Sequence, residues 1–86
     1  MEYNYLTVLR REVLREMTAG IKADLSRYFD SQSISIEDKE NPLVVLFLKI
    51  MKIGESLVRQ EKSMEELDEI TGQLKFVKEY VGELTN

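Results

Sequence analysis

The scarcity of helix-breaking residues is the strongest constraint on what this chain can fold into. Its 86 residues include one proline and four glycines, so long helices are allowed almost everywhere. Ser33–Ile36 alternates polar and apolar side chains, but no longer stretch has the period-two pattern of a half-buried strand. The sequence therefore predicts an all-α fold.

Apolar residues at helical spacing predict a first helix over about residues 4–30, with Asn4 as its N-cap. A stripe with steps of three and four places several apolar side chains on one face, since an α-helix has 3.6 residues per turn. These residues are Leu6, Leu9, Val13 and Met17. The stripe drifts near Gly20, and we expect the helix to kink or break there.

Two capping signals mark the later helices. After a predicted loop over residues 31–42, Asn41 and Pro42 form an N-cap followed by proline at the first helical position, which starts a second helix over about residues 43–62. Ser63 and Glu66 match a capping box, which starts a third helix over about residues 64–84. The expected architecture is a small antiparallel bundle of three helices, with residues 1–86 as a single domain. One continuous helix over residues 43–84 is the alternative, because Gln60 and Glu61 do not break helices.

The composition argues against catalysis. The chain has no His and no Cys, which removes the commonest general base, the commonest zinc ligand and most nucleophile pairs. We therefore expect a non-enzymatic protein with no cofactor and no metal. The longest uncharged apolar run, Leu43–Leu48, is far shorter than the roughly 20 residues of a membrane span. No targeting signal is present, so we expect a cytoplasmic protein without a membrane partner.

One acidic pattern supports an enzymatic alternative. Glu37 and Glu40, followed by Glu65 and Asp68, resemble the paired Glu-x-x-Glu and Glu-x-x-Asp signature of all-α nucleotide pyrophosphohydrolases. Four such carboxylates can hold Mg²⁺, which prefers oxygen ligands. The first pair falls in a predicted loop rather than a helix, however. With 16 acidic residues in the chain, such spacings also arise readily by chance.

Basic residues in the first helix could form a phosphate-contacting strip; they are Arg10, Arg11, Arg15 and Lys22. Acidic residues alternate with them, the net charge is −4, and the isoelectric point is about 4.9. Nucleic-acid-binding proteins usually present an unopposed basic face. This charge pattern argues against direct nucleic-acid binding.

The apolar surplus predicts a protein partner. The start of the second helix is apolar nearly all round, and the third helix carries a heptad-like seam, which together exceed what a small monomer buries. We predict an interaction module that forms a homodimer or a heteromeric assembly. Its predicted interface residues are Leu43, Leu46, Phe47, Leu67, Ile70, Leu74, Val77, Val81 and Leu84.

The order of short motifs resembles the helical domain of the archaeal and eukaryotic GINS replication factors. These motifs are Leu9-Arg10-Arg11-Glu12, the break at Gly20, Ile21–Leu25 with Tyr28 and Phe29, Leu48–Ile53, and Ser63–Leu67. The chain lacks room for that family's small β-rich second domain and lacks the prolines expected before the aromatic segment. The resemblance implies a role in assembling a replicative helicase through helix–helix contacts, without catalysis.

Overall fold

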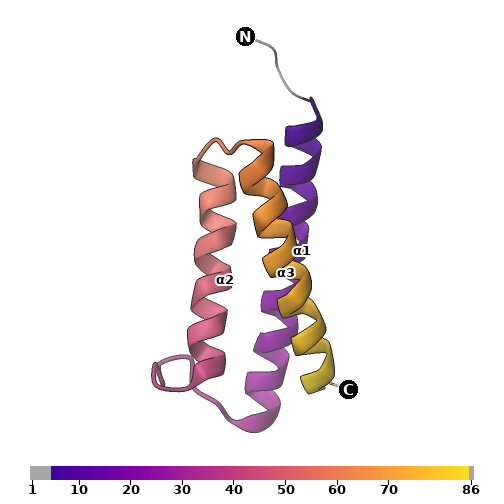
Figure 1. Ribbon diagram of the computed structural model, residues 1–86. Helices are drawn as coiled ribbons and strands as arrows, with labels where there is room; N and C mark the ends of the chain where they lie inside the picture. The colour runs from indigo at the N-terminus through magenta and orange to yellow at the C-terminus, as the bar shows by residue number, and fades with distance from the viewer. Residues whose placement is uncertain (1–4, 86) are drawn as a thin grey trace.

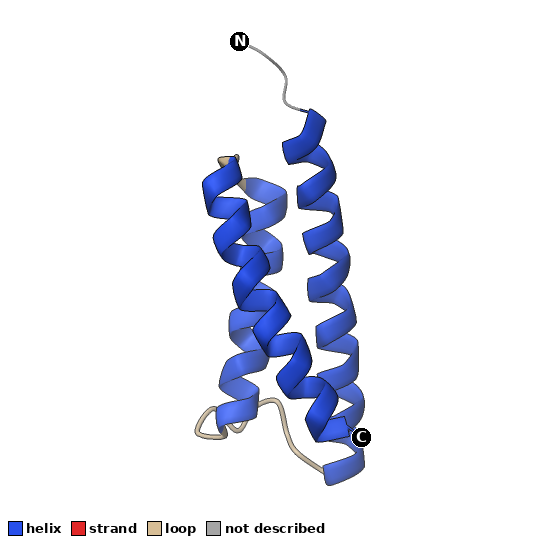
Figure 2. Ribbon diagram, turned by 45° about the vertical axis from the view of Figure 1, so that its right-hand side comes forward, coloured by secondary structure: helices blue, strands red, loops and turns tan. Residues whose placement is uncertain are grey.

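Three α-helices make up the computed structural model, which describes residues 5–85 (Figure 1). They are α1 (Tyr5–Gln32), α2 (Pro42–Arg59) and α3 (Met64–Thr85). The chain runs down α1, back along α2 and down again along α3, so α2 is antiparallel to the other two helices. Within residues 5–85 the elements are helices and their connecting loops, with no strand (Figure 2). The predicted all-α bundle of three helices is confirmed.

α1 is one continuous helix of 28 residues, and it passes through Gly20 without interruption. The predicted break there is wrong, and a kink is not confirmed. Gly20 does not have the positive φ of a helix-terminating glycine. Its intrinsic cost of about 1 kcal/mol is offset by the buried side chains on either side of it, Leu14 and Ile21 among them. The predicted N-cap, Asn4, lies outside the described residues.

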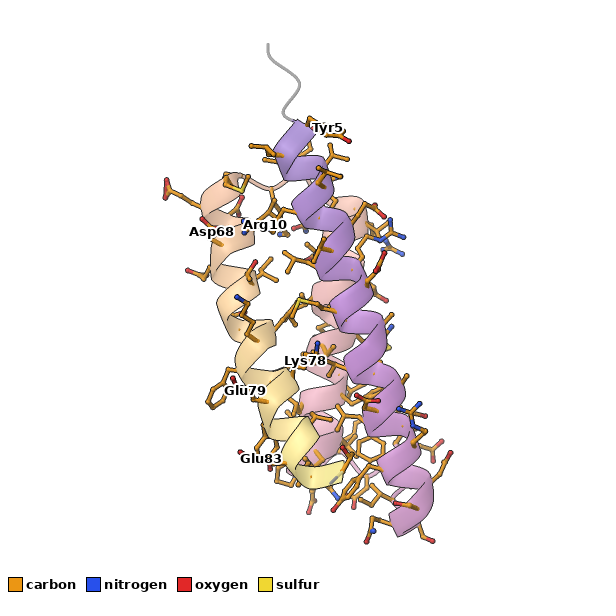
Figure 3. All side chains as sticks on the ribbon, turned by 90° about the vertical axis from the view of Figure 1, so that its right-hand side faces the viewer. Tyr5, Arg10, Asp68, Lys78, Glu79 and Glu83 are labelled. Carbon is orange, nitrogen blue, oxygen red and sulfur yellow. The ribbon has the colours of Figure 1, made fainter. Side chains whose placement is uncertain are left out.

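α1 is longer than its neighbours, and its first turns extend past the connection between α2 and α3 (Figures 1 and 2). At 1.5 Å per residue, its 28 residues span about 42 Å, whereas the 18 residues of α2 span about 27 Å. Tyr5 lies at this projecting end (Figure 3). The side chains of these first turns are therefore little covered by α2 and α3.

α2 begins as the sequence predicts and ends three residues earlier. The side chain of Asn41 accepts a hydrogen bond from the Leu43 backbone N–H at 2.9 Å, and Pro42 occupies the first helical position. At the other end Gln60 is extended, with φ −118° and ψ 140°. The alternative of one continuous helix over residues 43–84 is therefore wrong.

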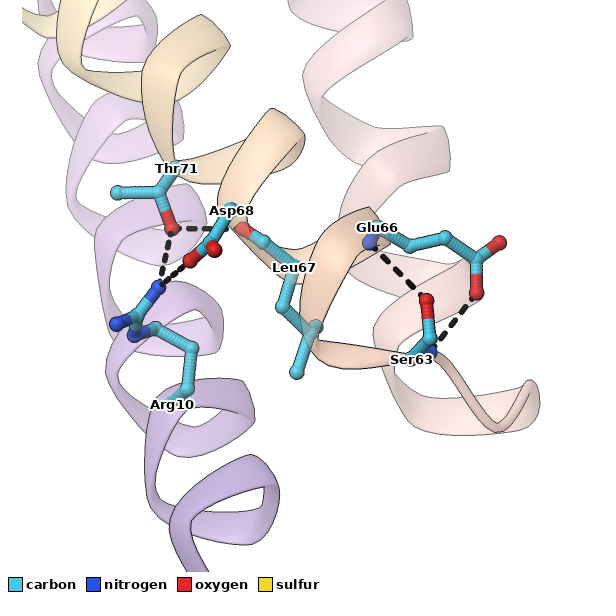
Figure 4. A network of polar contacts seen from close by, with 6 residues as sticks. All are labelled: Arg10, Ser63, Glu66, Leu67, Asp68 and Thr71. Atoms are coloured by element: carbon cyan, nitrogen blue, oxygen red, sulfur yellow. Dashed lines mark hydrogen bonds and ion pairs between the residues drawn. The ribbon is translucent and has the colours of Figure 1, made fainter.

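A capping box starts α3, as predicted. The Ser63 backbone N–H donates to Glu66 Oε1 at 2.9 Å, and the Glu66 N–H donates to Ser63 Oγ at 3.2 Å (Figure 4). Two backbone donors that the helix leaves unpaired are thus satisfied by side chains. The bond from the Ser63 backbone N–H favours the charged carboxylate and lowers the pKa of Glu66 from its ordinary value of 4.5.

The core is one cluster of buried apolar side chains to which all three helices contribute. Its members are Leu14, Ile21, Leu25, Phe29, Val44, Ile50, Leu57, Leu67, Leu74 and Val81. Among residues 5–85, Thr18 is the one buried polar residue, and its hydroxyl donates to the Arg15 carbonyl at 2.7 Å. Thr18 also lies against α2, because a Cβ built on Gly54 would be 3.2 Å from Thr18 Oγ1. The absence of a side chain at Gly54 lets the two helices approach closely.

α1 is the central helix of the three. Both α2 and α3 pack on it, whereas no Cα atom of α2 lies within 8 Å of a Cα atom of α3. The two outer helices therefore leave an open side between them, and each also forms a boundary with α1.

We expect Gly54→Ala to gain less stability than Gly72→Ala. At Gly72 a Cβ meets nothing within 4 Å, so alanine should raise the free energy of unfolding by about 0.5–1 kcal/mol through helix propensity. At Gly54 the new methyl group presses on the hydrogen-bonded Thr18 hydroxyl. Urea denaturation of both variants tests this. In a Thr18→Ala background, Gly54→Ala should raise the free energy of unfolding as much as Gly72→Ala does. Equal gains of the two variants in the wild-type background would contradict the tight contact between Gly54 and Thr18.

The lowered pKa of Glu66 predicts a pH-dependent contribution to stability. Its charged form is favoured in the folded state, so this contribution is complete above the ordinary pKa of 4.5 and disappears as the pH falls through the folded-state pKa. In thermal melts between about pH 7 and pH 3, the melting temperature of Glu66→Gln should fall less on acidification than that of wild type. Glu65→Gln is the matched control, since it removes a charge from the same helical turn and leaves the capping bond intact.

Candidate protein-binding surface

The first three turns of α1 carry a group of exposed apolar side chains, which we call the α1 strip. Its members are Tyr5 (65% exposed), Leu6 (64%), Leu9 (44%) and Val13 (55%). Isolated apolar residues are common on protein surfaces, but a contiguous group on one helix is typical of interaction sites. The projecting position of this end of α1 explains why α2 and α3 do not cover it.

The α1 strip and the core face of α1 are two different stripes. The core stripe runs through Leu14, Ile21 and Leu25, and one residue corresponds to about 100° around a helix. Val13 is therefore rotated by that angle away from Leu14. Helical spacing puts Leu9 and Val13 on the same face as Met17, and the structure leaves both Leu9 and Val13 exposed, while Val13 and Met17 line the boundary with α3.

A groove follows the boundary between α1 and α3, and we call it the α1–α3 groove. Its upper part has a volume of about 590 Å³ and is lined by Arg10, Val13, Leu14, Met17, Asp68, Thr71, Gly72 and Lys75. A lower part of about 290 Å³ shares two of these residues and is lined by Val13, Glu16, Met17, Gly20, Ile21, Asp24 and Lys78. Lys78 lies over the boundary between the two helices (Figure 3).

Arg10 ties the two walls of the α1–α3 groove together. Its Nη1 lies 2.5 Å from Asp68 Oδ1 and donates to Thr71 Oγ1 at 3.4 Å (Figures 3 and 4). The Thr71 hydroxyl in turn donates to the Leu67 carbonyl at 2.7 Å. Because both charged side chains are more than a third exposed, the ion pair contributes at most about 1 kcal/mol. It links α1 to α3 near the projecting end.

The basic residues of α1 do not form an unopposed strip. Arg10 pairs with Asp68, and Arg15 pairs with Glu12 at 2.8 Å, one turn away on the same helix. By contrast, Lys75 and Lys78 are exposed on α3, and neither has an ion pair within residues 5–85. Glu16 and Asp24 line the lower part of the groove beside Lys78, so the α1–α3 groove has three basic and three acidic lining residues and no net charge.

A second apolar surface lies on the open side between α2 and α3, and we call it the α2–α3 groove. It has a volume of about 340 Å³ and is lined by Pro42, Leu43, Leu46, Phe76, Val77 and Tyr80. Phe76 is the most exposed large apolar residue described, at 73%. Glu79 and Glu83 adjoin Phe76 and Tyr80, so the edge of this groove on α3 is acidic.

The nine residues predicted as an interface divide into two groups. Leu67, Leu74 and Val81 are at most 1% exposed and belong to the chain's own core, so they are not available to a partner in the folded chain. The others are half-buried and are Leu43, Leu46, Phe47, Ile70, Val77 and Leu84. Three of these six line the α2–α3 groove. Their role in binding a partner stays a prediction.

The four carboxylates of the pyrophosphohydrolase pattern do not come together. Glu37 and Glu40 lie in the loop between α1 and α2, whereas Glu65 and Asp68 lie in the first turns of α3, at the opposite end of the bundle (Figure 1). Within residues 5–85, no group of three or more His, Cys, Asp or Glu side chains is arranged to hold a metal ion. The geometry gives this alternative no Mg²⁺ site.

Comparison with known proteins identifies the family. The family model described as bacterial epsilon antitoxin matches residues 3–84. The chain belongs to the bacterial epsilon antitoxin family. It is also 28% identical, over 71 residues, to Antitoxin PezA of Streptococcus pneumoniae serotype 4 (strain ATCC BAA-334 / TIGR4). That match covers 83% of this chain and 45% of PezA, so the chain spans about half the length of this relative. No solved structure matches the chain.

Membership of an antitoxin family corrects the predicted function and identity. The resemblance to GINS replication factors is wrong, and the implied role in DNA replication is wrong with it, because the family model covering residues 3–84 is that of an antitoxin. The pyrophosphohydrolase alternative is wrong for the same reason. The unspecified interaction module is replaced by an antitoxin. The expectation of a non-enzymatic chain is confirmed by the family, and an antitoxin family is consistent with the expected protein partner. In addition, none of the helices within residues 5–85 has the length and apolar character of a membrane span.

The α1 strip is an exposed surface that was not predicted from the sequence. The available signal was the presence of two apolar stripes on one helix, Leu6–Val13 and Leu14–Phe29. A helix that packs on one side only needs a single stripe. A second stripe that drifts away from the first therefore indicates a second contact.

If the α1 strip is not part of the chain's own core, polar substitutions there should leave folding nearly unchanged. We expect Leu9→Ser and Val13→Ser to change the free energy of unfolding by no more than about 0.5 kcal/mol. Leu14→Ala, at a fully buried neighbouring position, should cost about 2–5 kcal/mol. Urea denaturation measures all three. A loss of more than about 2 kcal/mol for Val13→Ser would show that the strip belongs to the core.

Proposed function

We propose that this chain is the toxin-binding part of an antitoxin. It binds the toxin through the α1 strip and thereby neutralises it. The observation that carries the proposal is an exposed apolar surface on a member of an antitoxin family. The chain's own fold does not use this surface, because its core is formed by the other stripe of α1. The complex is thus a heteromer of antitoxin and toxin.

The size of the α1 strip is consistent with a stable complex. Fully burying an apolar side chain contributes about 1.5–3 kcal/mol, so the strip can supply several kcal/mol toward binding. Part of this is offset by the lost freedom of the two proteins on association. Tyr5 adds an aromatic ring with a polar tip, a residue type enriched in the binding hot spots of interfaces.

The strip also lies where a partner can reach it. The first turns of α1 project beyond the rest of the bundle, so a concave surface can surround them on several sides (Figure 2). Because the described chain corresponds to about half of PezA, the proposal concerns toxin binding alone and no other activity of that relative.

A growth assay tests the proposed function. Genes next to the one that encodes this chain are expressed from an inducible promoter in a bacterial host, and a product that stops growth is taken as the toxin. We expect the wild-type chain, when co-expressed, to restore growth and to bind the purified toxin. A toxic product that the wild-type chain neither binds nor neutralises would overturn the proposal.

The role of the α1 strip is tested in the same assay with two matched variants. Val13 and Val58 are both valines on helices, exposed by 55% and 59%. We expect Val13→Asp to weaken binding by at least about tenfold, because it places a charge in a desolvated contact. Val58→Asp, on α2, should bind as wild type does. Equal affinities of the two variants would show that the toxin binds elsewhere.

A further inference from the structure

The α2–α3 groove is separated from the α1 strip along the length of the bundle. Phe47, which follows the groove residue Leu46, packs its ring against Phe29 of α1, with centroids 5.8 Å apart. Phe29 lies 16 residues beyond Val13, the last residue of the strip, which corresponds to about 24 Å along a helix. The proposed toxin contact therefore does not by itself account for the α2–α3 groove.

The position of the groove suits a helix. Because α2 and α3 both pack on α1 and not closely on each other, they form the two walls of the open side of the bundle. A helix laid between them would contact both, as the fourth helix of a four-helix bundle does. Each wall supplies three lining residues, and none of the six is charged. On α3 these include Phe76 and Tyr80, which are 73% and 44% exposed.

The edge of the groove on α3 is acidic. Glu79 and Glu83 adjoin the exposed Phe76 and lie on the side of α3 away from α1 (Figure 3). The lysines of this part of α3, Lys75 and Lys78, line its boundary with α1 instead. Neither glutamate has an ion pair within the described residues. An occupant of the groove therefore meets two unpaired negative charges.

The α2 side of the groove does not cancel this charge. The loop over residues 33–41, which leads into α2 at the same end of the bundle, contains three acidic residues and one lysine (Figure 1). On α2 itself, Lys49 is exposed about one turn beyond Leu46. Two acidic residues on α3 and three in the loop thus stand against two lysines, an excess of three negative charges. Because complementary charge selects among partners, this end of the chain favours a basic surface.

We propose that the α2–α3 groove binds an amphipathic helix with a basic polar face, supplied by a partner protein. The apolar face of that helix packs on Leu46 and Phe76, and its lysine or arginine side chains pair with Glu79 and Glu83. A second copy of this chain is a poorer occupant, because a contact between two identical surfaces brings the two acidic edges together. The site is separate from the proposed toxin contact, and both can be occupied at once.

A pair of designed peptides tests the chemistry of the occupant. The first has 18 residues, the length of α2, with leucines on one face of the helix and lysines on the other. The second keeps the leucines and has glutamate in place of every lysine. Calorimetry with the full chain should show at least about tenfold tighter binding of the lysine peptide, and this binding should weaken with salt. No binding of the lysine peptide, or equal affinities of the two peptides, would overturn the proposal.

Two serine variants test whether the peptide lies in the groove. Phe76→Ser removes the most exposed apolar side chain of the groove and should weaken binding of the lysine peptide by at least about tenfold. Val58→Ser is the control, since Val58 is also exposed (59%) but lies near the other end of α2. Its affinity should stay within about threefold of wild type. Circular dichroism melts check that both variants are folded, and equal affinities of the two would show that the peptide binds outside the groove.

Two charge reversals separate the acidic edge from the overall charge of the chain. Glu79→Lys and Glu55→Lys change the net charge equally. Glu55 is exposed on α2, 13 residues after Pro42 and thus about 220° around the helix from it. We expect Glu79→Lys to weaken binding of the lysine peptide by at least about fivefold and Glu55→Lys by less than about twofold. Equal losses would mean that the acidic chain attracts the peptide without a specific site, and the proposal would be wrong.

Light scattering and the toxin complex test the other occupants. A wild-type dimer that Phe76→Ser converts to a monomer, and Val58→Ser does not, would place a second copy in the groove and contradict the proposal. The chain bound to the toxin from the growth assay should bind the lysine peptide with unchanged affinity. Loss of peptide binding in that complex would show that the toxin covers the groove and that the site is not separate. The peptide measurements on the free chain need no toxin, so they stand or fall independently of the proposed function.

Discussion

The packing of α1 against both other helices is the contact on which the rest of the structure depends. α2 and α3 do not approach each other closely, so each is held in place mainly through α1. On one side, Thr18 lies against Gly54, and the rings of Phe29 and Phe47 have centroids 5.8 Å apart. On the other side, the core seam of α3 packs on α1, and Arg10 pairs with Asp68. A bundle built in this way leaves one open side and two boundaries along α1, and the candidate binding surfaces are found there.

The small size of the chain explains why α1 carries both the fold and the proposed contact. A chain of 86 residues buries only about 60–65% of the surface that its unfolded state exposes, so its apolar residues are divided between a small core and the surface. The division follows the two stripes of α1. Leu14 and Ile21 are needed for folding because all three helices meet around them, whereas Leu9 and Val13 remain exposed on the folded chain.

Local signals predicted where α2 and α3 start, whereas tertiary packing decided how far α1 continues and which of its faces is buried. The caps at Asn41 and Ser63 involve hydrogen bonds between residues at most three apart, so the sequence is sufficient to find them. The continuity of α1 through Gly20 depends instead on core contacts before and after it, which outweigh the cost of one glycine. Likewise, the choice between the stripe of Val13 and that of Leu14 as the core face is made by the positions of α2 and α3. Spacing along α1 does not contain that information.

The same reasoning explains why the candidate surface was only partly predictable. The seam of α3 at Leu67, Leu74 and Val81 has the regular spacing of an interface, but a regular seam equally suits the core of a three-helix bundle. The family resemblance failed for a related reason. Motifs such as Leu9–Glu12 combine common helix-forming residues and reflect amphipathic helices in general, so they carry little information about ancestry.

The proposed contact also has a consequence for the free chain. The projecting end of α1 is fastened to α3 by an ion pair whose partners are 37% and 61% exposed, which is a weak link. A toxin that binds the α1 strip, as proposed, also reaches the boundary with α3, because Val13 belongs to the strip and lines that boundary. A ligand that binds only the folded state stabilises it, and the gain grows with the logarithm of the ratio of ligand concentration to Kd. Toxin binding as proposed would therefore add to the stability of a boundary that is held mainly by the buried Leu67, Leu74 and Val81 and, near the projecting end of α1, by the weak ion pair.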